Sequence, residues 1–221
     1  MLVFGQPHIE KKEILEVLNT LKSGWLGTGP KVKKFEKLIS RYKKVKNTIA
    51  VNSCTAALHL SLLVIKIKKG DEVILPAMTF TATANAIIHA GGIPVFADCE
   101  IGSMNIDIKD IEKKITKKTK AIIPVHFAGR PCEMDKILTL AKKNNLKVIE
   151  DCAHAIETKY NGKFAGTFGD IGCLSFYVTK NVVTGEGGAL ITNNLKYANQ
   201  LKVLALHGLT QNAWSRFSDK G

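Results

Sequence analysis

The stretch GDEVILPAMTFTATANAIIHAGGIPVFA, residues 70–97, decides the fold. It contains an apolar run over residues 72–75, a helical segment over 79–90 and a second apolar run over 93–97. Short continuous apolar runs on either side of a helix are typical of parallel strands that are buried on both faces. Its uncharged part, residues 79–97, is interrupted by two glycines and a proline, so it does not predict a membrane span.

The same alternation continues on both sides of this stretch. In the helix that begins at Pro30, the spacing predicts that Val32, Phe35, Leu38, Ile39 and Tyr42 face inward. Together the elements predict an α/β fold, with three layers (α/β/α) and a mostly parallel central sheet. Other helices are predicted over 10–22, 55–65, 107–115, 133–143 and 195–206, other strands over 48–51, 121–125, 146–150, 173–177 and 189–192, and a hairpin at Asn161-Gly162.

Charge is the one unusual feature of the composition. The 221 residues include 32 Lys and Arg against 19 Asp and Glu, which gives a formal net charge of +13. Only Arg41, Arg130 and Arg216 are arginines, and the lysines are spread along the chain. A nucleic-acid-binding protein is expected to cluster its basic residues and to use more arginine. The pattern therefore favours solvated surface lysines over nucleic acid as a partner, and a functional basic field remains the alternative.

The five cysteines do not form a metal or disulfide pattern. Their number is odd, no CxxC pair occurs, and their surroundings are apolar or glycine-rich. This predicts reduced thiols in a cytoplasmic protein, with no metal site. Residues 1–5 lead directly into charged helical sequence, so we expect neither a signal peptide nor a membrane partner.

Candidate site residues lie in the loops that follow the strands, where sheets of this kind bind ligands. Ser53 and Thr55 open a helix; they could simply cap it, or its free N–H groups could bind a phosphate. Phe80 begins the next helix and could stack on a flat ring or pack in the core.

Two further loops carry ionisable side chains. Glu150 and Asp151 end a buried strand, where carboxylates need partners. Asp151 could cap a helix or pair with a protonated ring nitrogen, and His154, three residues later, can lie on the same side of the turn. Lys180 follows the strand over 173–177 and is either a solvated loop lysine or a desolvated amine that attacks aldehydes.

Taken together, these loops contain the parts of a pyridoxal 5'-phosphate (PLP) site. They supply an anion-binding helix end, an aromatic ring, a carboxylate for the pyridine nitrogen, the Ser175 hydroxyl and a lysine. In such a site Asp151 would keep the pyridine nitrogen protonated, so that the cofactor can act as an electron sink. Lys180 would move a proton as general acid and base.

Six motifs, in order over nearly the whole chain, carry a resemblance to one family. They are SGWLGTGP (23–30), SCTAALH (53–59), GDEVILPAMTF (70–80), EDCAH (150–154), SFYVTKN (175–181) and GEGG (185–188). This combination resembles the DegT/DnrJ/StrS family of PLP-dependent sugar aminotransferases, which have fold type I.

The resemblance implies a role for each site residue. Lys180 and Asp151 are the catalytic residues it implies, the first as the lysine that binds PLP covalently and the second as the partner of the pyridine nitrogen. The other cofactor-binding residues that it implies are Thr55, Ala56 and Ser175 at the phosphate, and Phe80 and His154 at the ring. In the loop over 24–29, Trp25 and Thr28 are expected near the sugar substrate.

The resemblance also implies a reaction and a domain organisation. The amino group of an amino acid, usually glutamate, passes to a keto group of a nucleotide-linked sugar, for cell-surface polysaccharide or related amino-sugar biosynthesis, in a homodimer. Residues 1–45 are expected to form an N-terminal helical segment with the substrate loop, 46–210 a PLP-binding large domain, and 211–221 the start of a connection to an absent C-terminal domain. A truncated non-catalytic protein with a regulatory or binding role, and a PLP enzyme that acts on amino acids, are the alternatives.

Overall fold

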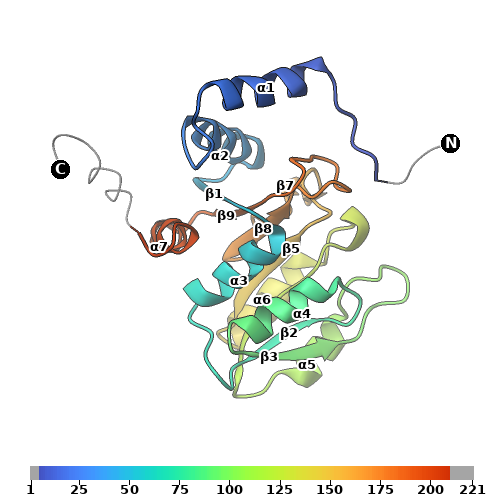
Figure 1. The fold of residues 1–221 in the computed structure, drawn as a ribbon. Helices are drawn as coiled ribbons and strands as arrows, with labels where there is room; N and C mark the ends of the chain where they lie inside the picture. Colours follow the sequence, from blue (N-terminus) through green and yellow to red (C-terminus); the bar gives the residue numbers. More distant parts are fainter. Residues whose placement is uncertain (1–4, 210–221) are drawn as a thin grey trace.

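A mixed seven-stranded sheet forms the centre of the computed structural model, which describes residues 5–209 (Figure 1). The strand order is β1-β9-β8-β5-β4-β2-β3. Only β9 runs antiparallel to its neighbours, so the other six strands end on one side of the sheet. The strands are β1 (Asn47–Val51), β2 (Glu72–Pro76), β3 (Ile93–Ala97), β4 (Thr119–Ile122), β5 (Lys147–Cys152), β8 (Ile171–Ser175) and β9 (Gly188–Thr192).

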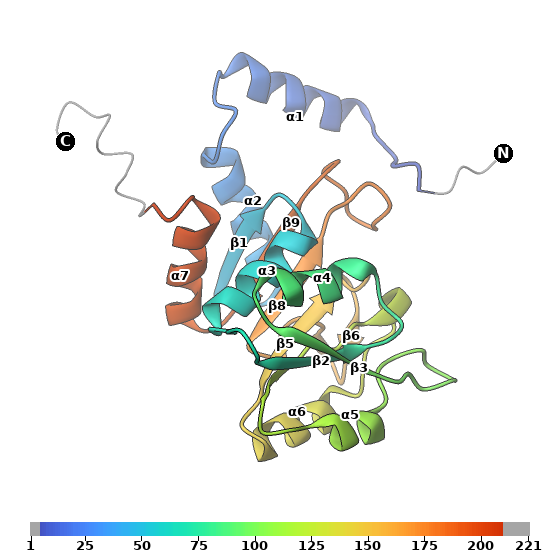
Figure 2. The same cartoon turned by 60° about the horizontal axis from the view of Figure 1, so that its bottom comes forward.

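Helices cover both faces of this sheet, so the predicted three-layer architecture is confirmed (Figure 2). Successive strand residues point to opposite faces, and Cys173 and Leu190 pack under one helical layer while Leu174 and Ile191 pack under the other. The first layer contains α3 (Cys54–Val64), α4 (Thr81–His89) and α7 (Leu195–Ala205). The second contains α2 (Pro30–Lys43), α5 (Ile108–Lys114) and α6 (Met134–Lys143).

Local sequence signals begin and end these elements as predicted. Pro30 is the first residue of α2, and the Ser53 side chain caps α3. Asn161 and Gly162, with φ of 47° and 78°, form the tight turn between β6 (Lys159–Tyr160) and β7 (Lys163–Phe164). A short 3₁₀ helix, η1 (Phe127–Gly129), precedes α6.

Some boundaries differ from the predicted ones near the site. β5 continues to Cys152, so Asp151 lies within the strand and does not cap a helix. β8 ends at Ser175, and β4 ends at Ile122, beyond which Val125 forms only an isolated bridge with Asp151.

The inward face of α2 was only partly predicted. Ile39 is buried, but Leu38 and Tyr42 are 54% and 47% exposed, so the prediction that they face inward was wrong. Lys43 is buried instead. Its ammonium donates to the carbonyl oxygens of Ala155 and Ile156, and these hydrogen bonds stabilise the buried position of the side chain.

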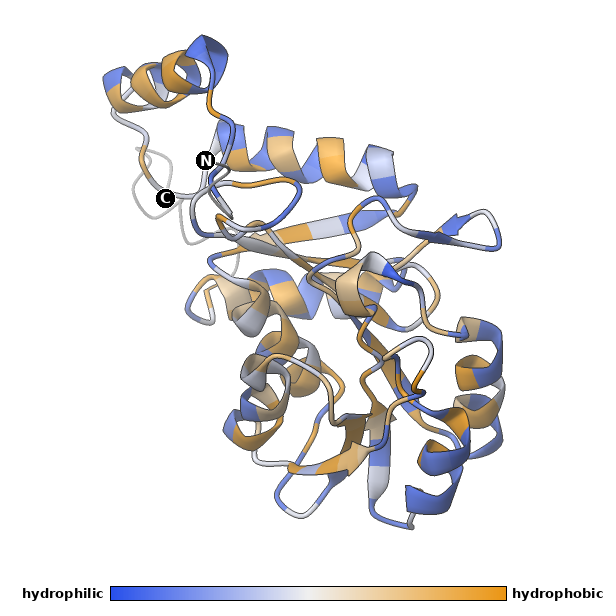
Figure 3. Cartoon of the chain, turned by 90° about the vertical axis from the view of Figure 1, so that its right-hand side faces the viewer, coloured by the Kyte–Doolittle hydropathy of each residue, from blue (hydrophilic) through white to orange (hydrophobic). Residues whose placement is uncertain are grey.

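The helix α1 (Lys11–Lys22) stands away from the sheet (Figure 1). None of its residues is buried, although it carries apolar side chains at helical spacing, which Figure 3 shows as orange segments between blue ones. Its apolar stripe consists of Ile14, Leu15, Val17, Leu18 and Leu21, all exposed to solvent. Residues 5–209 therefore contain nothing that covers this stripe.

The five cysteines all lie among the described residues and are free thiols. No helix within residues 5–209 is both long enough and apolar enough to cross a bilayer.

The buried Lys43 generates a prediction about pH. Burial lowers the pKa of its ammonium below the ordinary value of 10.5, while Glu150 and Glu157 act in the opposite direction. Because the unfolded chain then binds this proton more tightly than the folded one, the free energy of unfolding should rise as the pH increases toward 10.5. In Lys43→Met this rise should be smaller than in the wild type.

Urea unfolding across the alkaline range measures this difference. Lys37→Met, on an exposed position of the same helix, is the matched control and should keep the wild-type slope. If the free energy of unfolding of Lys43→Met rose with pH as steeply as that of the wild type, the lowered pKa of Lys43 would be contradicted.

Candidate functional site

The site lies on the side of the sheet where the six parallel strands end. The first residue of β9, Gly188, lies at this side, paired with Val51 of β1 and Ser175 of β8. A Cβ atom on Gly188 would lie 2.3 Å from the carbonyl carbon of Ser53. Only glycine therefore allows the loop before α3 to approach the sheet this closely.

The N-terminus of α3 has the cap that the sequence offered as one alternative, and the other alternative, phosphate binding, stays a prediction. Ser53 is the cap: its Oγ accepts from the Ala56 N–H at 3.1 Å, and its carbonyl accepts from the Ala57 N–H at 3.1 Å. The N–H groups of Cys54 and Thr55 have no such acceptor among the described residues, as is usual in a first helical turn. These N–H groups and the Thr55 hydroxyl could bind an anion.

Asp151 lies at the end of β5, and its side chain is 5% exposed. Its Oδ1 accepts from the Ala153 N–H at 3.1 Å, and its Oδ2 accepts from the Thr83 hydroxyl at 2.9 Å. Burial raises the pKa of the carboxyl, and these two hydrogen bonds oppose that effect. A nearby cation, such as a protonated ring nitrogen, would stabilise the ionised form further.

Asp151 and Lys180 each lie near enough to His154 and to Cys54 for their charges to act on these two groups. The pKa of His154 is lowered by partial burial and by the Lys180 ammonium, and raised by the Asp151 carboxylate. The pKa of the Cys54 thiol is raised by burial and by Asp151, and lowered by Lys180. Cys54 is the first residue of α3, so the predicted acid, lysine, histidine and phosphate loop meet in one place.

Hydrogen bonds of its loop position Lys180. The Lys180 N–H donates to the Tyr177 carbonyl at 2.9 Å, and the Asn181 amide donates to the Glu157 carboxylate. The Thr184 N–H donates to the Phe176 carbonyl at 2.9 Å and so closes the loop. Lys180 is half-buried, which lies between the two alternatives that the sequence left open, a solvated loop lysine and a desolvated amine.

Phe80 is the N-cap residue of α4 and is 79% exposed. The alternative that it packs in the core was therefore wrong for the described residues. A large aromatic ring at this position is available to a ligand at the carboxyl side of the sheet.

The remaining predicted residues are divided between this place and a neighbouring cavity. The Ser175 Oγ, buried at the end of β8, accepts from the Tyr177 N–H at 3.4 Å. Thr28 and Ala56 both line an open cavity of about 460 Å³ between the loop over 24–29, α3 and α7. Trp25 does not line it; its indole N–H donates to the Thr28 carbonyl at 3.2 Å, and its ring packs over Gly29.

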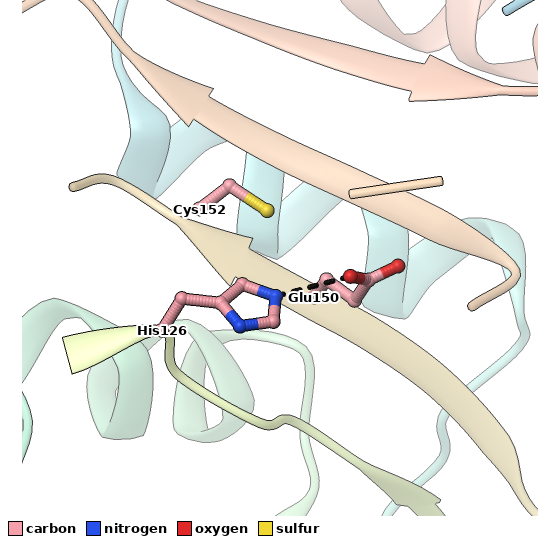
Figure 4. A group of neighbouring side chains, drawn as sticks. All are labelled: His126, Glu150 and Cys152. Carbon is pink, nitrogen blue, oxygen red and sulfur yellow. Dashed lines mark hydrogen bonds and ion pairs between the residues drawn. The ribbon is translucent and has the colours of Figure 1, made fainter. Parts of the chain in front are cut away.

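Glu150 has a structural role that the sequence did not reveal. It is fully buried on the face of β5 opposite to Asp151, together with His126 and Cys152 (Figure 4). Its two oxygens accept from the N–H groups of Gly166, Phe168 and Gly169 and from His126 Nε2, at 2.7 to 3.0 Å. The carboxylate therefore fixes the 166–169 turn that leads into β8.

His126, Glu150 and Cys152 hold potential metal-ligand atoms within 4.8 Å of one another, but their hydrogen bonds explain the cluster without a metal. His126 Nδ1 accepts from the Cys132 N–H at 3.1 Å, so the ring proton lies on Nε2 and is donated to Glu150. Each Glu150 oxygen accepts two bonds, which uses the lone pairs that a metal would need.

Glu150→Gln should be strongly destabilising. The amide NH₂ that replaces one oxygen would face two N–H groups and could not accept their hydrogen bonds. The remaining oxygen cannot accept all four bonds. We expect a loss of about 3 kcal/mol in the free energy of unfolding, the size usual for a buried charged partner. Glu112→Gln, at an exposed position, is the control and should change stability by less than about 0.5 kcal/mol. Equal losses in the two variants, measured by urea unfolding, would show that Glu150 does not hold the turn.

The Thr79 and Thr83 hydroxyls were also missed in the sequence. Thr83 is buried and contacts Asp151, and the Thr79 Oγ1 lies 2.8 Å from the Thr83 Oγ1. The sequence signal for them is two threonines four residues apart, one just before and one in the first turn of the helix that follows β2.

Comparison with known proteins gives one consistent family. A model of the DegT/DnrJ/EryC1/StrS aminotransferase family matches residues 7–221. The chain is 49% identical to the spore coat polysaccharide biosynthesis protein SpsC of Bacillus subtilis over 220 residues, which is 100% of this chain and 57% of that protein. It is 46% identical to GDP-perosamine synthase of Escherichia coli O157:H7 over 190 residues, 86% of this chain and 52% of the synthase.

A solved structure agrees with these relatives. The putative sugar aminotransferase Spr1654 from Streptococcus pneumoniae, in its PMP form, superposes with a TM-score of 0.92 at 37% identity, over 96% of this chain and 59% of that one. The chain thus spans little more than half the length of the proteins it matches.

Proposed function

The chain belongs to the DegT/DnrJ/EryC1/StrS aminotransferase family, and from this premise we propose that it is the cofactor-binding part of a PLP-dependent sugar aminotransferase. The observation that carries the proposal is the meeting of Asp151, His154, Lys180 and the start of α3 at one side of the sheet. We propose residues 46–210 as the cofactor-binding unit and 1–45 as the helical segment with the substrate loop. The connection predicted over 211–221 lies outside the described residues.

The residues present fit PLP. The buried Asp151 carboxylate suits a protonated pyridine nitrogen, because burial raises the pKa of the carboxyl and a cation beside it would stabilise the ionised form. The N–H groups at Cys54 and Thr55 suit the phosphate, with Ala56 and Ser175 beside them, and the exposed Phe80 ring suits the face of the pyridine. Lys180 would hold the cofactor through its amine.

When bound, PLP would supply the electron sink that allows an amino group to leave one carbon and join another. Asp151 would hold the positive charge of the ring nitrogen, and burial strengthens that interaction. Lys180, once its amine is free, would remove and return the proton at the reacting carbon as general base and acid. His154, with its pKa lowered, would stay neutral near the ring at neutral pH.

We propose a keto group of a nucleotide-linked sugar as the acceptor. We propose an amino acid as the donor, and glutamate is the first one to test. The donor becomes a 2-oxo acid as the sugar ketone becomes an amine. The name of the E. coli relative, GDP-perosamine synthase, supports a nucleotide-linked amino sugar, and that of the B. subtilis relative supports polysaccharide biosynthesis. Thr28, which lines the cavity beside Ala56, and the neighbouring Trp25 are proposed to contact the sugar.

We also propose that the protein works as a homodimer in the cytoplasm. Large apolar side chains are exposed around the carboxyl side of the sheet, including Met78, Phe80, Ile101 and Tyr177. A second copy that covered them would also close the site from water.

Lys180→Ala tests the cofactor proposal directly. Adding PLP to the wild type should give a visible absorbance band and, after borohydride reduction, a covalent adduct that mass spectrometry locates on Lys180. Both should be lost in Lys180→Ala and kept in Lys37→Ala. A wild type without adduct would refute PLP binding.

Transfer is measured separately, with glutamate and a keto nucleotide sugar against glutamate and simple keto acids. Transfer to the sugar is the expected result. An adduct without transfer to either acceptor would favour the alternative of a non-catalytic, PLP-binding protein. That alternative is considered because the chain covers 57% of the length of SpsC.

A further inference from the structure

Thr83 carries a hydroxyl at a place where packing alone would favour an apolar side chain. The other buried residues of α4 are Ala86 and Ile87, and Thr83 is only 1% exposed. A hydroxyl removed from water costs free energy unless it is hydrogen-bonded. Its presence on this face therefore requires a polar partner.

That partner is Asp151, and the direction of the hydrogen bonds follows from counting protons. Thr83 Oγ1 donates to Asp151 Oδ2 at 2.9 Å. A threonine hydroxyl has one proton, so the 2.8 Å contact between Thr79 Oγ1 and Thr83 Oγ1 has Thr79 as donor. The result is a relay from Thr79 through Thr83 to the carboxylate.

The start of α4 holds this relay in place. Thr83 is in the first turn, where its own N–H donates to the Phe80 carbonyl at 3.1 Å. The Thr83 hydroxyl donates to Asp151 and not to a carbonyl one turn earlier, the bond that mid-helix threonines often make. The same turn presents the exposed Phe80 ring, so one short segment places both Phe80 and the donor to Asp151.

We propose that Thr83 is a positioning residue and that the Thr79–Thr83 relay orients the Asp151 carboxylate toward the ring nitrogen of the cofactor. This inference rests on the proposed function, because the ring nitrogen belongs to PLP. Oδ2 accepts from Thr83 and Oδ1 from the Ala153 N–H. Each oxygen keeps a further lone pair, so the fixed carboxylate can still accept from a ligand.

The relay also acts on the charge of Asp151. Burial raises the pKa of the carboxyl, and the Ala153 and Thr83 hydrogen bonds lower it because they stabilise the ionised form. Removing the Thr83 hydroxyl should therefore raise that pKa further. The other ionisable groups that interact electrostatically with Asp151 are Cys54, His154 and Cys173 and, from the opposite face of β5, His126 and Cys152. Lys180 acts on two of them, Cys54 and His154.

A cofactor-free titration tests the relay independently of PLP. The Asp151 carboxyl is followed by ¹³C NMR of the full chain labelled at aspartate Cγ, with Asp151→Asn to assign the signal. The midpoint in Thr83→Val should lie about one to two pH units above the wild-type value, the size of one lost hydrogen bond to a charged group. Thr83→Ser should restore the wild-type midpoint. Thr81→Val, at an exposed position of the same turn, is the control and should not shift it.

A second variant keeps the test decisive if Thr83→Val does not fold, as judged by circular dichroism. Thr79→Val removes only the outer donor of the relay and should shift the midpoint in the same direction by a smaller amount. An unshifted midpoint in whichever of the two variants is folded would overturn the proposal.

PLP binding gives the second readout. The dissociation constant should rise about ten-fold in Thr83→Val and stay near the wild-type value in Thr83→Ser, in line with one lost hydrogen bond to a charge. Equal affinity in all variants, in a wild type that binds PLP, would overturn the positioning role. If the wild type does not bind PLP, the proposed function fails, while the titration still shows whether the relay acts on Asp151.

Discussion

The structure depends on the need to supply hydrogen-bond donors to two adjacent buried carboxylates. Glu150 and Asp151 end the central strand β5, and the alternation of a strand directs them to opposite faces of the sheet. Each therefore draws its donors from a different helical layer and its loops. Glu150 is served by His126 and the 166–169 turn, and Asp151 by the start of α4 and by its own following turn.

The contacts of these two carboxylates and the close approach at Gly188 link the ends of five strands, β5, β8, β9, β1 and β2. The turn fixed by Glu150 leads directly into β8, whose far end carries the Lys180 loop. β8 and β1 both pair with β9, and Gly188 allows the start of α3 to rest against that strand. α4, which follows β2, delivers its threonines to Asp151. The acid, the lysine and the phosphate loop are thus placed by contacts within the same part of the sheet.

Sequence reasoning could predict whatever depends on local pattern. Apolar runs, the Pro30 and Ser53 signals and the Asn161-Gly162 turn located the elements. The ends of the predicted strands drew attention to Asp151 and Lys180, whose roles stay predictions. The burial of Lys43 and the exposure of Leu38 could not be predicted, because they depend on which carbonyl groups the rest of the fold brings near α2. Thr83 was missed for the same reason: its partner lies 68 positions later in the chain.

The two buried carboxylates also show how a structural acid can be told from one that can serve a ligand. A carboxylate offers about four acceptor positions. Donors from the protein fill all four at Glu150, so it can hold a turn but has nothing left for a further partner. Asp151 has two donors among residues 5–209 and a pKa raised by burial, which leaves it both the room and the electrostatic reason to accept a cationic donor. Burial and neighbourhood in the chain are nearly the same for the two residues, and the unfilled acceptor positions distinguish them.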